Sequence, residues 1–159
     1  MRLLFLLLFM SLPFISPSQD SSLVGKIDFK QLYGIPGWEN LDKDFATYHP
    51  DSLFIQNIMS KSDKIAELTL FLGTWCSDSQ EQVPKVWKVL QSLHLDKKIR
   101  IYGVNRDKTE PRIELDRFKA TKLPSLFVSI KNQEVIQILN EIPEVNFETD
   151  FWNKIKVVH

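Results

Sequence analysis

The chain contains a single cysteine, Cys76, within the segment Gly-Thr-Trp-Cys-Ser-Asp-Ser at residues 73–79. This segment directly follows the apolar run Leu-Thr-Leu-Phe-Leu at residues 68–72, so the order predicts a buried strand that leads into the first turn of a helix. A helix N-terminus stabilises negative charge, and the thiolate is the reactive form of cysteine. The position of Cys76 therefore favours thiol–disulfide chemistry.

Ser79 stands where a C-x-x-C pair would carry its second thiol. With one thiol, exchange stops at a mixed disulfide until an external thiol resolves it. Disulfide isomerisation, removal of glutathione-like caps and the holding of a partner through a mixed disulfide remain open, and so does a Cys76-linked dimer. The Ser79 hydroxyl is a candidate hydrogen-bond donor to the thiolate, or else an ordinary hydroxyl in a first helical turn. Trp75 is expected to pack beside the thiol and to shape access to it.

Other kinds of chemistry find little support in the sequence. The three histidines, His49, His94 and His159, show no Cys–His catalytic signature and are expected at the surface or at caps. There is no metal-ligand spacing and no phosphate-binding glycine loop, so neither a metal nor another cofactor is expected. The 20 basic and 20 acidic residues balance, which gives no electrostatic footprint for nucleic acid or an anionic membrane.

The first residues are typical of a targeting segment. A positive start at Met1 and Arg2 precedes an apolar stretch at residues 3–10, and Pro13 precedes small residues. This pattern predicts a signal peptide over residues 1–18 and an exported protein, periplasmic or secreted, with no membrane contact after cleavage. The alternative is an uncleaved membrane anchor, although the stretch is shorter than the roughly 20 apolar residues of a membrane-spanning helix.

Residues 19–60 are expected to form an N-terminal extension that covers one face or edge of the following domain. Alternating apolar and polar residues at 26–33 predict an edge strand, and Gly-Ile-Pro-Gly at 34–37 predicts a turn. Residues 41–48 have a helical pattern that His49-Pro50 interrupts. Asp51 is then placed to cap a second short helix.

Residues 61–159 are expected to form one α/β domain. In the helix after Cys76, the spacing of Val83, Val86, Trp87 and Leu90 predicts a buried face, with Gln82, Lys85, Lys88 and Gln91 outward and Pro84 as a kink. Strands are predicted at 65–72, 99–104, 126–130 and 135–139, and further helices at 111–119 and 147–158. The early strand–helix–strand crossover requires parallel neighbours, whereas the late hairpin requires antiparallel ones. The expected architecture is a central mixed β-sheet with helices on both faces.

This order of elements resembles the thioredoxin superfamily over residues 65–155. The residues that carry the resemblance are Trp75-Cys76-x-x-Ser79 at a helix start, Pro84 within that helix, and Leu123-Pro124-Ser125 before the hairpin. The sequence Gly-Thr-Trp-Cys-x-Asp-Ser is also similar to a subgroup of exported bacterial thioredoxin-like proteins. The resemblance implies a thioredoxin-like fold with a cis peptide bond between Leu123 and Pro124 facing Cys76. It also implies that Trp75, Leu123 and Pro124 contact an extended substrate.

The chain departs from the family pattern at two buried positions. Thioredoxins commonly carry an aspartate six residues before the nucleophile and a lysine on the next strand, where this chain has Leu70 and Gly103. Two hypotheses therefore stay open. One is monothiol exchange with protein or small-molecule thiols and disulfides, with Cys76 and Ser79 as the catalytic residues. The other is a non-catalytic thioredoxin-fold binding module in which Cys76 is a vestige.

Overall fold

The computed structural model describes residues 22–131 and 135–158. The predicted signal peptide at 1–18 lies outside the described residues, as do residues 19–21, the tip of the late hairpin at 132–134, and His159. None of the described helices is long and apolar enough to cross a membrane.

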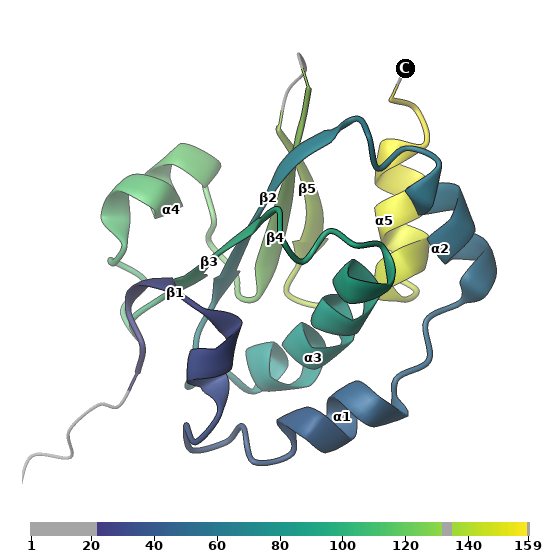
Figure 1. Ribbon diagram of the computed structural model, residues 1–159. Coiled ribbons are helices and arrows are strands. Elements are labelled where there is room, and N and C mark those ends of the chain that lie inside the picture. Colours follow the sequence, from purple (N-terminus) through teal and green to yellow (C-terminus); the bar gives the residue numbers. More distant parts are fainter. Residues whose placement is uncertain (1–21, 132–134, 159) are drawn as a thin grey trace, which may run out of the picture.

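The centre of the structure is a five-stranded mixed sheet with the strand order β1-β3-β2-β4-β5 (Figure 1). β2 and β3 are parallel, as the crossover requires, and the other neighbouring strands are antiparallel. β2 is the central strand, and most of its residues are buried because both faces of the sheet are covered. The strands are β1 (Gly25–Ile27), β2 (Ile65–Leu72), β3 (Ile99–Gly103), β4 (Ser125–Ile130) and β5 (Val135–Asn140).

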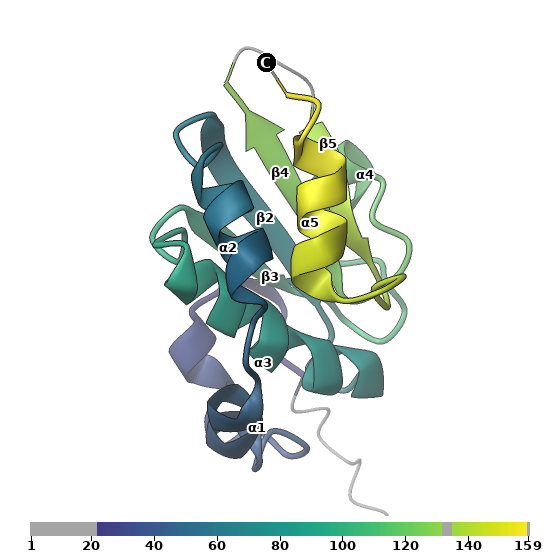
Figure 2. The same ribbon diagram turned by 90° about the vertical axis from the view of Figure 1, so that its right-hand side faces the viewer.

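Helices cover both faces of this sheet, which confirms the α/β architecture that was expected. α4 lies alone on one face, and α3 and α5 pack on the other (Figure 1). Outside this second face, α1 packs on α3 and α2 packs beside α5 (Figure 2). The helices are α1 (Leu41–Thr47), α2 (Ser52–Met59), α3 (Ser77–Ser92), α4 (Arg112–Phe118) and α5 (Phe147–Ile155), and a 3-10 helix, η1, spans Phe29–Leu32.

The two faces of the sheet have separate apolar cores. The larger core lies beneath α3 and α5 and includes residues of the N-terminal extension such as Leu32, Trp38 and Ile58. The smaller core lies beneath α4, where Phe71 of β2 contacts the rings of Phe118 and Phe127. Trp75 and Cys76 pack against the smaller core, so the thiol lies on the same side of the sheet as α4.

The extension covers an edge and a face of the sheet, as expected, but its first strand is shorter than predicted. β1 ends at Ile27, where the prediction extended to residue 33. Asp28 ends the strand because its side chain accepts a hydrogen bond from the Lys30 amide, while the Gln31 side chain accepts one from the Asp28 amide. This reciprocal capping starts η1. Asp51 caps α2 as predicted, through the Leu53 amide.

α3 begins directly after Cys76 and contains Pro84, as the sequence predicts. The predicted outward orientation of Gln82 is wrong, because this residue is 6% exposed. It lines a small pocket together with Tyr48 and residues of the segment 142–147. Both come from distant parts of the sequence, so the local pattern gave no sign of them.

Candidate functional site

Cys76 is the N-cap residue of α3 and lies where β2 delivers the chain to the helix. Its backbone is extended, with φ −94° and ψ 122°, as N-cap geometry requires. The thiol is partly exposed. Sγ donates a hydrogen bond to the Leu123 carbonyl oxygen at 3.6 Å. Among the described residues, the thiol makes no capping hydrogen bond to the helix, so the helix N-terminus stays available to it.

The turn between β2 and α3 is closed by a hydrogen bond from the Cys76 amide to the Gly73 carbonyl, at 3.0 Å. A Cβ at Gly73 would lie 2.9 Å from the indole of Trp75 and 3.2 Å from the Cys76 Cβ. Glycine is therefore needed for the tight packing of this turn. The turn holds Cys76 and Trp75 next to each other at the end of the central strand.

The peptide bond between Leu123 and Pro124 is cis, as the family resemblance implied. Both residues are buried, and the Leu123 carbonyl faces the Cys76 thiol. The Pro124 carbonyl accepts a hydrogen bond from the Glu141 amide at 2.8 Å, and Ser125 Oγ donates to the Lys122 carbonyl at 2.7 Å. These bonds fix the loop that lies opposite the thiol. A second cis bond, between Glu110 and Pro111, was not predicted.

Ser79 and Trp75 both have well-defined hydrogen bonds near the thiol. Ser79 is fully buried, and its Oγ accepts a hydrogen bond from the Gly73 amide at 3.2 Å. This bond ties the first turn of α3 to the end of β2. The indole of Trp75 is partly exposed and donates from Nε1 to the Val104 carbonyl at 2.9 Å, with the Arg106 guanidinium 5.4 Å from its ring centroid. Trp75 and Cys76 pack against the same small core.

The two positions that depart from the family pattern are filled by other interactions. Leu70 is fully buried in the larger core and pairs with Ile101 of β3. At Gly103 the chain is crossed by the N-terminal segment, and a Cβ there would overlap the Leu23 carbonyl oxygen. A lysine at Gly103 does not fit this arrangement. The two positions at which thioredoxins commonly carry an aspartate and a lysine therefore serve packing in this structure.

The residues that anchor the thiol turn to the extension were missed by the sequence reasoning. The Thr74 carbonyl accepts hydrogen bonds from Trp38 Nε1 at 2.8 Å and from Gln80 Nε2 at 2.9 Å. Thr74 Oγ1 accepts one from the Leu23 amide at 3.2 Å. Trp38 lies 36 positions before Thr74, so only the tryptophan after the Gly-Ile-Pro-Gly turn gave a hint of this contact.

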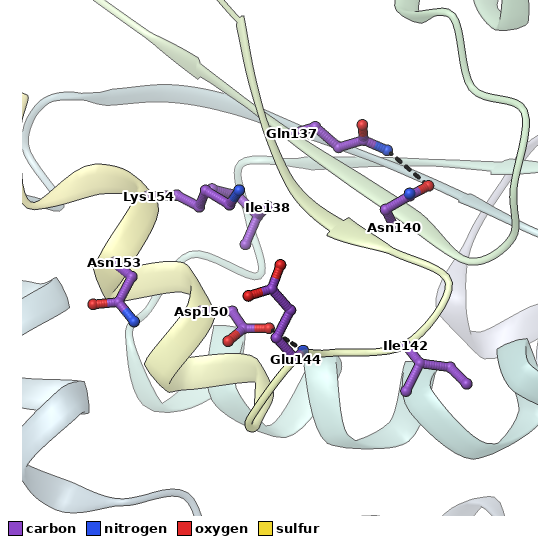
Figure 3. Close-up of a pocket in the computed structure, with 8 residues that line it drawn as sticks. All are labelled: Gln137, Ile138, Asn140, Ile142, Glu144, Asp150, Asn153 and Lys154. Atoms are coloured by element: carbon purple, nitrogen blue, oxygen red, sulfur yellow. Dashed lines mark hydrogen bonds between the residues drawn. The ribbon is translucent and has the colours of Figure 1, made fainter.

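A separate polar pocket of about 380 Å³ lies between β5 and α5 (Figure 3). In this pocket Asp150 accepts a hydrogen bond from the Glu144 amide at 2.6 Å, and Gln137 donates one to Asn140 at 3.4 Å. None of the predicted site residues lines it. His49 and His94 are exposed. No group of three histidine, cysteine, aspartate or glutamate residues suited to a metal ion occurs within residues 22–131 and 135–158.

No family model matches the chain, and a search of curated proteins gives no significant match.

Proposed function

We propose that the protein is an exported thioredoxin-like protein that carries out thiol–disulfide exchange through Cys76 alone. The order of strands and helices, the mixed sheet and the loop at Leu123–Pro124 support this reading of the fold. The observation that carries the proposal is the position of the thiol. It is partly exposed at the start of α3 and lies 3.6 Å from a backbone carbonyl of the opposite loop.

The Cys76 sulfur lies between the Leu123 carbonyl and the N-terminus of α3. As a thiol, Sγ has a proton to donate to the Leu123 carbonyl. As a thiolate it has none, and it then gains by turning toward the amide groups of the first turn of α3. The first amides of a helix have no partner within the helix and attract negative charge. Ser79 holds this turn against β2 through the Gly73 amide, which keeps the amides in place.

The exchange proceeds in two steps with external thiols. The Cys76 thiolate attacks one sulfur of a disulfide, so that a new S–S bond forms to Cys76, the old S–S bond breaks, and the leaving thiolate takes up a proton. A second thiolate, from the substrate itself or from a small thiol, then attacks the mixed disulfide and releases Cys76 as a thiolate. When the thiolate of the substrate itself resolves the mixed disulfide, the substrate is isomerised with no net change in oxidation state. When the first disulfide joins a substrate thiol to a small-thiol cap, Cys76 takes the cap, the substrate leaves as a thiolate, and the small thiol that releases Cys76 ends as its own disulfide.

The test is the rate at which the folded protein reacts with oxidised glutathione, followed by mass spectrometry between about pH 5 and pH 9. We expect one glutathione per chain, formed faster than on a small free thiol at the acidic end of this range. Cys76→Ser is the control and is expected to take up none. A rate no higher than that of the small thiol at every pH would refute the proposal.

A rate no higher than that of the small thiol would favour the alternative, a non-catalytic binding module. The leucine at position 70 supports that alternative, because the position where thioredoxins commonly carry an aspartate holds no group that could move a proton. An assay with a protein that carries scrambled disulfides separates the remaining activities. Recovery of the native disulfides indicates isomerisation, whereas release of glutathione from a second substrate, a glutathione-capped protein, indicates removal of caps.

A further inference from the structure

The N-terminal extension makes direct hydrogen bonds to the turn that carries the candidate thiol. Thr74 accepts two hydrogen bonds from the extension. Its carbonyl accepts one from the Trp38 indole, and its hydroxyl accepts one from the Leu23 amide. Trp38 and Thr74 are 3% and 2% exposed. Buried hydrogen bonds are stronger than hydrogen bonds in water, and a buried polar group that loses its partner lowers the stability of the fold.

The fit between the extension and α3 is close at this point. Gly37 has a φ of +90° and lies against Gln80, where any Cβ would overlap the side-chain amide. The missing side chain lets Gln80 reach the Thr74 carbonyl beside the Trp38 indole. The Gly37 amide is itself held by the Glu39 carboxylate at 3.0 Å, which lowers the pKa of Glu39. The extension therefore presents a fixed surface to the turn.

Thr74 lies close to Cys76 in the same tight turn, so a displacement of the Thr74 peptide also displaces the thiol. Only Trp75 separates Thr74 from Cys76, and the Cys76 amide closes the turn on Gly73. If the Thr74 carbonyl rotates, this turn and the start of α3 move with it. The distance from Sγ to the Leu123 carbonyl and the direction toward the helix amides then change together.

We propose that Trp38 and Leu23 of the N-terminal extension are positioning residues that set the reactivity of Cys76 by holding Thr74. The inference rests on the proposed thiol exchange and adds a role for the extension beyond covering the sheet. Neither residue contacts the thiol. Each acts through a different atom of Thr74, so the two contacts can be removed one at a time.

Two variants test the two contacts. Trp38→Phe keeps an aromatic ring in the core but removes the indole donor, and Thr74→Val keeps the shape of the side chain but removes the acceptor of the Leu23 amide. Trp87→Phe is the matched control. Trp87 also packs on the extension, with its ring stacked on Phe29 at 4.0 Å, but it has no contact with Thr74 among those described.

The readout is the rate constant for reaction of Cys76 with oxidised glutathione, measured across the pH range under conditions where each variant is fully folded. We expect Trp38→Phe and Thr74→Val to react roughly threefold to tenfold more slowly than the wild type, with a displaced pH profile, because small misplacements of a reacting group are costly. Trp87→Phe is expected to retain the wild-type profile even if its stability is lower.

The outcomes separate this inference from the proposed function. If the wild type reacts no faster than a small thiol, the proposed function fails. If the wild type is reactive and both Thr74-directed variants follow its profile, the extension does not position the thiol and the inference is overturned. If Trp38→Phe does not fold, Thr74→Val decides alone, because it keeps the volume of the side chain.

Discussion

A buried contact between Tyr48 and Glu148 joins the N-terminal extension to the last helix and offers a sharp test of the structure. The Tyr48 hydroxyl donates to Glu148 Oε2 at 2.6 Å, and the Asp51 amide donates to Glu148 Oε1 at 2.9 Å. Glu148 is 2% exposed, so these two donors compensate for a buried carboxylate. Tyr48→Phe removes one donor and leaves the ring in place.

The expected loss follows from the kind of hydrogen bond that is removed. Bonds to charged groups contribute about 1.5–3 kcal/mol, and the short distance to a buried carboxylate favours this class over neutral bonds. Because Tyr48 is only half-buried and Glu148 keeps the Asp51 amide, we expect a loss of about 2 kcal/mol in the free energy of unfolding. This corresponds to a decrease in Tm of about 6 °C for a domain of this size. Urea and thermal unfolding measure both quantities.

The pH dependence has a definite sign. Burial, the adjacent hydrogen bond to Glu148 and the negative charge of Glu148 raise the pKa of Tyr48 above its usual value of 10.0. The neutral phenol is thus favoured in the folded state, and its contribution is fully present below about pH 10. Above that pH the unfolded chain ionises first and the contribution is lost. The stability difference between the wild type and Tyr48→Phe should therefore be constant from neutral pH to about pH 10 and shrink beyond it.

Tyr33→Phe is the matched control, because Tyr33 also donates to a carboxylate, that of Asp42, at 2.8 Å. Tyr33 is 50% exposed, so we expect its substitution to change the free energy of unfolding by less than about 0.5 kcal/mol. Equal effects of the two substitutions would contradict the role of burial. An unchanged stability of Tyr48→Phe would show that the contact with Glu148 does not hold the extension.

Two further substitutions test the structure around the thiol. Gly103→Ala places a Cβ against the Leu23 carbonyl oxygen and must displace the backbone there. We expect the free energy of unfolding, measured by urea titration, to fall by about 1–3 kcal/mol. An unchanged urea midpoint would mean that Leu23 does not cross the strand at this point. Ser79→Ala removes the acceptor of the buried Gly73 amide and should cost about 1–3 kcal/mol by the same measurement; a stability equal to that of the wild type would refute this structural role of the hydroxyl.

Elements with strong local patterns were predictable from the sequence. Strand β2 has the predicted bounds because it is mostly apolar and ends at a glycine. The edge strand was predicted too long because the capping pair Asp28 and Gln31 was not considered. The cis bond at Leu123–Pro124 was reached through the family resemblance, since two residues alone do not distinguish it from the bond at Glu110–Pro111.

The candidate thiol was found from the sequence, whereas the residues that hold it were not. Cys76 follows a buried strand and starts a helix, which are local features. The bonds from Leu23 and Trp38 to Thr74 span 51 and 36 positions, and no periodicity in the sequence connects such distant residues. Burial of Gln82 was missed for the same reason, because the residues that line a pocket with it come from distant segments.

The contact of α2 with α5 has a consequence for how this chain reaches its native state during synthesis. The bonds from Tyr48 to Glu148 and from Lys61 to the Val158 carbonyl span 100 and 97 positions. The contact of α2 with α5 therefore cannot form until residues 147–158 have left the ribosome. Closing such long loops is slow. A nascent chain therefore exposes the side of α2 that packs on α5 until that helix has been synthesised.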